Sequence, residues 1–268
     1  MTADAFPGPV SRRSRMGALG HIELIMLLRN RSALVSALVL PLGSLWLLHT
    51  VTPSTFAAGD GERVAAGPAL ATGTIGMVLL FVVYSTLVGA YVARREALVL
   101  KRLRTGALTD GEILVGTALP AAGVAWAQCA LVIGVGMTML DVRAPASPEL
   151  LVVGVAVGTV LVAALAACSA VFTRTVEMAQ LTTMPLILVS VAGSGLAMPL
   201  EAMPSWAAEA CRFLPLTPVM EVVRLGWLGT DGGAAAWSAA LPQLGGALLW
   251  TGAAVWGART WFRWEPRR

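Results

Sequence analysis

The chain has 268 residues, of which 57% are hydrophobic and only 13% are charged. A soluble domain carries about 25% charged residues, so this chain cannot cover a water-facing surface and is predicted to lie in a membrane. Its net charge of +4 is compatible in sign with nucleic-acid binding. The charges lie in loops between apolar segments, however, which is typical of membrane topology, so no nucleic-acid partner is expected.

Residues 1–31 are predicted to form a cytoplasmic N-terminus. Within it, Met16 to Leu28 reads as an interfacial amphipathic helix that lies along the membrane surface, with His21 and Glu23 as polar interruptions. The first apolar segment begins only after Arg31 and lacks a cleavage site, so no cleaved signal peptide is expected.

Six apolar stretches then follow, each close to the 20 or so residues that a helix needs to cross the hydrocarbon. The predicted spans are about 33–51, 69–93, 113–140, 150–172, 178–200 and 237–258. They lack the alternation of barrel strands, and only helices or closed barrels satisfy their backbone in lipid. The predicted fold class is an all-α integral membrane protein, with a six-helix transmembrane domain over 32–258 and a cytoplasmic tail over 259–268.

Most of the 19 Lys and Arg residues fall on one side of this topology. They lie in the N-terminus, in the loop after the second span, at Arg174 and in the tail. The opposite side holds only Arg63, Arg143, Arg212 and Arg224. The positive-inside rule therefore places both termini in the cytoplasm of a multi-pass cell (inner or plasma) membrane protein.

The loop from Arg94 to Glu112 is predicted to contain a short basic helix that ends near Gly106. Thr109 then starts the next helix, with Glu112 three residues later forming a capping box. Charge alone favours a solvated loop that meets lipid phosphates; the alternative is a docking surface for a cytoplasmic partner.

Two short helices are predicted on the outer side, between Leu200 and Gly229. One begins at Pro204 and Ser205, and the other at Thr217 and Pro218. The second carries Glu221 and Arg224, three residues apart, and Arg224 is either buried in protein or in contact with headgroups.

Several kinds of chemistry are not expected. The single lysine, Lys101, follows Leu100 rather than glycine, so the chain has no P-loop. Ser194 between Gly193 and Gly195 resembles an intramembrane serine protease only superficially, and these glycines are better explained by a bend or close helix contact, like Gly154 and Gly158 in the fourth span. The three cysteines form no CxxC pair, so no metal or other cofactor is expected in this chain.

Three segments resemble the ABC-2 type transporter permeases, including antibiotic and drug efflux permeases. They are Arg29-Asn30-Arg31 with Leu40-Pro41, the stretch from Arg95-Glu96 to Glu112-Ile113, and the stretch from Ser194 through Met198-Pro199 and Trp206 to Leu214-Pro215 and Arg224. The family often has a proline before the Leu-Thr/Ser of the cytoplasmic loop, whereas this chain has Gly106-Ala107.

The resemblance implies a permease with a type V exporter-like fold. It implies an exporter of two permeases, as a homodimer or with a paralogue, and two separate P-loop ATPase subunits that bind ATP and Mg²⁺. It also implies two sets of site residues, one that couples to the ATPase and one that closes the external gate. The coupling candidates are Glu23, Glu96, Lys101, Arg102, Leu103 and Arg104, and the gate candidates are Pro199, Trp206, Phe213, Pro215 and Arg224.

The expected function is the export of a hydrophobic or amphipathic compound such as an antibiotic or drug. A polysaccharide or lipid exporter of the same superfamily is an alternative, and an ion-coupled carrier or a membrane sensor is a third. The spans contain no Asp, Glu, Lys or Arg, which weakens the ion-coupled carrier because no proton relay is evident.

Overall fold

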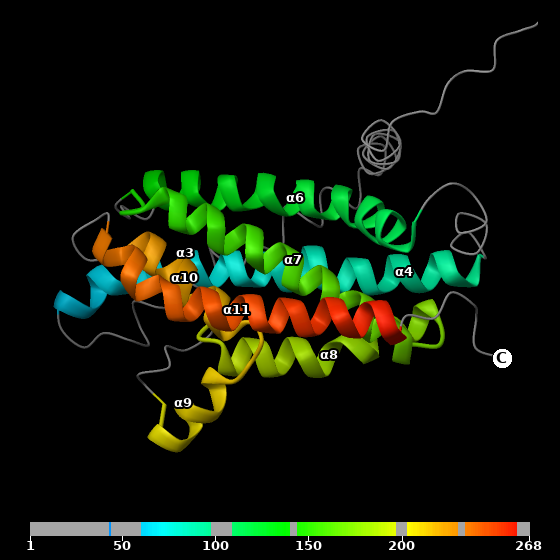
Figure 1. Ribbon diagram of the computed structural model, residues 1–268. Coiled ribbons are helices and arrows are strands. Elements are labelled where there is room, and N and C mark those ends of the chain that lie inside the picture. The colour runs from blue at the N-terminus through cyan, green and yellow to red at the C-terminus, as the bar shows by residue number, and fades with distance from the viewer. Residues whose placement is uncertain are drawn as a thin grey trace, which may run out of the picture.

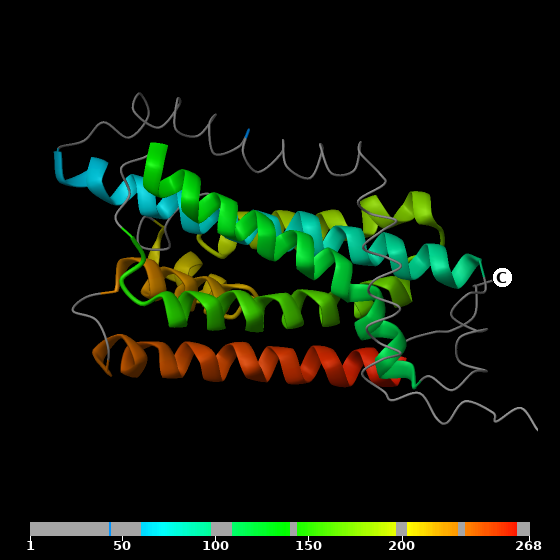
Figure 2. The same cartoon turned by 90° about the horizontal axis from the view of Figure 1, so that it is seen from above.

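The computed structural model describes Gly43 and residues 60–97, 109–139, 144–196, 203–229 and 234–261. Every regular element in these ranges is a helix, which confirms the predicted all-helical class. Figures 1 and 2 show the long helices lying side by side as a bundle, with the short helix α9 projecting from one end.

The first described span is one continuous helical run made of α3 (Asp60–Val78), η1 (Leu79–Ser85) and α4 (Thr86–Glu96). The middle segment, η1, is a π-helix, which widens the turn in the centre of the run. The run includes the predicted span 69–93 but continues through Arg94 and Arg95, which the sequence analysis assigned to a loop. The helix continues because both arginines find partners on neighbouring helices.

Three further helices coincide with predicted spans: α6 (Asp110–Met139), α7 (Pro148–Phe172) and α8 (Val176–Gly193). Together with the run Ala69–Glu96 they give four helices that are long and apolar enough to cross a membrane. The fifth span is predicted to end at residue 200, but the helix α8 ends seven residues earlier, at Gly193. Gly195 then adopts a φ of 71°, a left-handed conformation that a helix cannot continue through.

The sixth predicted span, 237–258, lies within α11 (Ala234–Trp261). This helix is long enough to cross, but its tryptophans, glycines and Gln243 lower its hydropathy, and it is not among the four. The first span and the interfacial helix of residues 16–28 lie outside the described residues, apart from Gly43. The six-span count therefore stays a prediction.

Helix α7 lies at the centre of the bundle, against α10 (Thr217–Leu228) and α11 (Figure 1). A Cβ at Gly158 would come within 2.8 Å of Val219, and one at Gly154 within 2.9 Å of Val223. Glycine is needed here because α10 approaches the α7 backbone too closely for a side chain. The close helix contact predicted at these two glycines is confirmed.

Both short helices predicted between Leu200 and Gly229 exist, with different surroundings. α9 (Ser205–Arg212) has no buried residue. α10 buries most of its side chains, among them Val219, Met220 and Trp227. It is thus an integral part of the bundle core, whereas α9 is peripheral.

Candidate functional site

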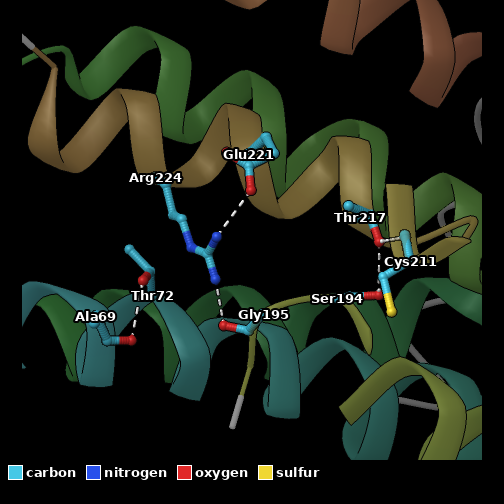
Figure 3. A network of polar contacts seen from close by, with 8 residues as sticks. All are labelled: Ala69, Thr72, Ser194, Gly195, Cys211, Thr217, Glu221 and Arg224. Atoms are coloured by element: carbon cyan, nitrogen blue, oxygen red, sulfur yellow. Dashed lines mark hydrogen bonds and ion pairs between the residues drawn. The ribbon is translucent and has the colours of Figure 1, made fainter. Parts of the chain in front are cut away.

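One cluster of polar contacts lies where α10 meets the turn after α8 (Figure 3). The Arg224 guanidinium donates to the Gly195 carbonyl oxygen and, at 2.8 Å, to a carboxylate oxygen of Glu221. Its side chain is only 14% exposed. Arg224 therefore bonds within the protein, and the predicted pairing with Glu221 is confirmed.

The start of α10 joins the same turn through a second set of contacts. The buried Thr217 hydroxyl donates to the Cys211 carbonyl oxygen at 2.7 Å and lies 3.1 Å from the Ser194 hydroxyl. Ser194 is fully buried. Figure 3 shows Ser194, Cys211 and Thr217 joined by these bonds, which give Ser194 a structural role between the end of α8, α9 and the start of α10.

At the opposite end of the bundle, Arg95 reaches from the last turn of α4 to the end of α7. It is 1% exposed and donates to the Ala170 carbonyl oxygen at 2.8 Å, to that of Thr173, and to that of Arg174 at 3.4 Å. The last carbonyls of a helix have no partner within it and carry its partial negative charge. The Arg95 guanidinium donates to these carbonyls at the end of α7, and its positive charge lies next to the negative end of that helix.

Other contacts hold α4 against the start of α6. Arg94 donates to the Thr117 hydroxyl at 2.7 Å, and the Tyr91 hydroxyl donates to the Leu114 carbonyl oxygen at 3.1 Å. The Glu112 carboxylate accepts from the backbone N–H of Thr109 at 2.7 Å and from its hydroxyl at 2.8 Å. The half of the predicted capping box in which the Glu112 carboxylate reaches back to the Thr109 N–H is thereby confirmed, whereas the Thr109 hydroxyl donates to that carboxylate. Both helices that flank residues 98–108 are consequently fixed in place.

Within the described ranges, no three His, Cys, Asp or Glu side chains gather closely enough to hold a metal ion. A model of the family described as "ABC-2 family transporter protein" matches residues 49–256. The chain belongs to the ABC-2 transporter family. A comparison with individually curated proteins finds no match.

The protein is thus a multi-pass membrane permease of the ABC-2 type, and the resemblance noted from its motifs is confirmed. ABC-2 permeases pair with ABC ATPase subunits, and their own membrane domains are typically non-catalytic. The family match gives no substrate.

Of the coupling candidates, only Glu96 lies among the described residues. It is exposed at the end of α4, next to the buried Arg95. Glu23, Lys101, Arg102, Leu103 and Arg104 lie outside the described part of the chain. Their role in this ABC-2 permease stays a prediction.

The gate candidates do not form one cluster. Trp206 and Phe213, on and just after α9, are 76% and 78% exposed and take no part in the Arg224 contacts. Pro215 is half-buried in the turn before α10, and Pro199 lies outside the described residues. Among the gate candidates in the described part of the chain, Arg224 is the one with a hydrogen bond to another element, at Gly195.

Sequence reasoning missed Arg95 as a structural link, because it counted this arginine with the positive charges of the cytoplasmic loop. A signal was available: Tyr91 and Arg95 are four residues apart, so on a continuous helix they share a face with Val88. An apolar and an aromatic residue on that face predict an inward position for Arg95, and the structure buries both of them.

Proposed function

We propose that this protein is the membrane-spanning subunit of an ATP-driven exporter. The ABC-2 family match carries the proposal, because permeases of this family work with ABC ATPase subunits. In this proposal two permease chains, as a homodimer or with a paralogue, assemble with two P-loop ATPases that bind ATP and Mg²⁺.

The distribution of Lys and Arg supports an orientation with both termini in the cytoplasm of the cell membrane. In that orientation, Arg95, Glu96 and the start of α6 face the ATPase side. The Arg224 cluster and α9 face the outside.

The contacts of Arg95 support a route by which the ATPase acts on the permease. Residues 98–108, which contain the coupling candidates Lys101, Arg102, Leu103 and Arg104, directly follow α4. Arg95 ties the end of α4 to the end of α7, and α7 contacts α10 through Gly158. A movement of the basic segment would thus displace α7 and, through it, the outer helix α10.

The outer end of that route is the contact between Arg224 and Gly195. When α10 moves with α7, this contact is the one that must break or shift relative to the end of α8. We therefore assign Arg224 the gating role among the candidates, with Trp206 and Phe213 at the outer membrane interface, where exposed aromatic side chains are common.

The substrate of this proposal is a hydrophobic or amphipathic compound such as an antibiotic or drug, which gives the protein a role in efflux. Its support is the apolar character of the helices. A polysaccharide or lipid exporter is the alternative within the same superfamily.

The experiment is purification of the tagged permease in mild detergent, followed by an ATPase assay of the proteins that co-purify. The test variant is R102E/R104E, and the matched control is R267E/R268E, which makes the same charge change in the predicted tail. We expect ATPase activity with the wild type and the control, and its loss with R102E/R104E at equal membrane expression.

Efflux of a lipophilic fluorescent dye from cells is the second measurement. Retained ATPase binding and normal efflux in R102E/R104E would show that the basic segment does not dock the ATPase. A wild-type permease that purifies without an ATPase, and whose transport survives without one, would instead assign the protein to the ion-coupled carriers.

A further inference from the structure

A groove with a volume of about 960 Å³ lies between α6, α7 and α11, and Tyr91 of α4 also lines it. This volume is at the upper end of the range of about 300–1,000 Å³ that small-molecule sites occupy. None of the contacts described above for Arg95 or Arg224 uses it. We refer to it as the α6–α11 groove.

The α6–α11 groove has a defined inner end. The Trp126 indole N–H of α6 donates to the Thr159 hydroxyl of α7 at 3.3 Å, and Thr159 lines the groove. From this point the groove runs toward the start of α6 and the end of α11, where Asp110 and Arg259 line it. The stretch of α6 from Asp110 to Ala122 has a length of about 18 Å at 1.5 Å per residue. One leaflet of hydrocarbon is about 15 Å thick, so the groove has the depth of a single leaflet.

The walls are apolar, and small side chains leave the space open. Ala118 and Ala122 of α6 and Ala163 and Ala167 of α7 are among the residues that line the groove. Larger apolar side chains that are partly exposed, such as Val115 and Val160, also line it. Such a surface suits an acyl chain, which needs apolar contact and no hydrogen bonds.

The charged side chains that line the groove gather at one end, and among them the Glu112 carboxylate is already bonded to Thr109. Arg259 is exposed there at the end of α11, and the Asp110 carboxylate lies at the start of α6. A guanidinium pairs well with a phosphate, and a carboxylate pairs with an ammonium group. The two signs of charge at one end of an apolar groove match a headgroup that carries both a phosphate and an amine.

We propose that the α6–α11 groove binds one zwitterionic phospholipid of the phosphatidylethanolamine type. An acyl chain lies along the alanines, the phosphate contacts Arg259, and the ammonium group contacts Asp110. The Lys and Arg distribution places this end of the bundle at the cytoplasmic leaflet, which supplies the lipid. The inference is independent of the proposed function, since binding requires neither an ATPase nor transport.

The experiment uses the full chain, delipidated in detergent and titrated with dioleoyl-phosphatidylethanolamine or dioleoyl-phosphatidylglycerol, with native mass spectrometry as the readout. We expect saturable binding of one phosphatidylethanolamine with an affinity about tenfold higher than that for phosphatidylglycerol. Equal binding of the two lipids, or no saturable binding, would overturn the proposal.

Two variants locate the site, each with a matched control. A163F fills the groove, whereas A253F adds the same ring at an exposed position of α11 that does not line it. R259Q removes the phosphate partner, whereas R212Q removes an exposed arginine on α9. We expect A163F and R259Q to weaken phosphatidylethanolamine binding about tenfold and the controls to leave it unchanged.

R259Q changes an exposed side chain and should therefore fold normally. It tests the site even if A163F does not fold. Binding by R259Q equal to the wild type would refute the headgroup contact. The same spectra report the oligomeric state. If A163F dissociates a dimer and leaves lipid binding unchanged, the groove binds a second copy of the chain and not a lipid.

Discussion

Arg224 of α10 donates a hydrogen bond to the Gly195 carbonyl oxygen, although 29 positions separate the two residues in the sequence. Gly195 presents this carbonyl because its φ of 71° turns the chain away from α8. The pair joins α10 to the end of α8, one of the four candidate membrane spans, and the gating role proposed above can be tested there.

Substitution of Gly195 by alanine should destabilise this junction. The left-handed conformation costs a non-glycine residue roughly 1–2 kcal/mol, and the new Cβ would overlap the Arg224 guanidinium. We expect a lower midpoint of thermal unfolding in detergent, measured by fluorescence-detected size exclusion.

The matched control for this substitution is Gly252→Ala, on α11, where no atom lies within 4 Å of the added Cβ. It should unfold at the wild-type temperature or slightly above, since alanine favours a helix by up to about 1 kcal/mol relative to glycine. Equal midpoints for the two variants would contradict the strained geometry at Gly195.

Replacement of Arg95 by glutamine should destabilise the permease more than the same change at Arg94. Arg95→Gln leaves buried carbonyls at the end of α7 without their donor, at a cost of about 1–3 kcal/mol. Arg94 is half-buried, and it donates to the Thr117 hydroxyl of the neighbouring helix, which itself donates to the Ile113 carbonyl oxygen and so keeps a partner after the change.

Arg95→Lys provides the second comparison. A lysine keeps the positive charge next to the α7 carbonyls but lacks the fork that reaches several of them at once. Its thermal stability should fall between that of the wild type and Arg95→Gln. Wild-type stability in Arg95→Gln would mean that the end of α7 does not depend on this side chain.

The packing of α7 on α10 should fail when Gly158 is enlarged. In Gly158→Leu the added side chain would meet Val219 and Leu79, both within 3 Å of the first new carbon. Overpacking of this kind costs typically about 1–3 kcal/mol. The control is Gly134→Leu on α6, where nothing lies within 4 Å. We expect a loss of monodisperse protein on size exclusion for the first variant only.

The bonds between Thr109 and Glu112 should contribute modestly to the stability of the first turn of α6. Thr109→Ala removes the hydroxyl that donates to the Glu112 carboxylate, and a typical hydrogen bond contributes about 0.5–1.5 kcal/mol. Hydrogen exchange of the first turn of α6 is the suitable measurement, because fraying there would precede global unfolding. Exchange at the wild-type rate in Thr109→Ala would show that packing alone holds the first turn.

The sequence by itself determined the features that depend on local composition and on the membrane. Apolar length located the helices that include Ala69–Glu96 and Pro148–Phe172, because a bilayer requires a continuous hydrogen-bonded helix of that length. Local side-chain chemistry located the capping box at Thr109, the starts of α9 and α10, and the pair Glu221–Arg224, since each involves residues only a few positions apart. The motifs of residues 94–112 and 194–224 indicated the family.

The tertiary structure alone decided which distant groups meet. Arg95 could have served as one more cytoplasmic charge, and it became the cap of α7 because Ala170 and Thr173 present their carbonyls beside the last turn of α4. Arg224 could have contacted lipid headgroups, but the turn at Gly195 brings an acceptor within reach. A long, flexible cation bonds to whichever acceptors the fold places near it, and the position of a carbonyl on a separate helix cannot be read from local sequence.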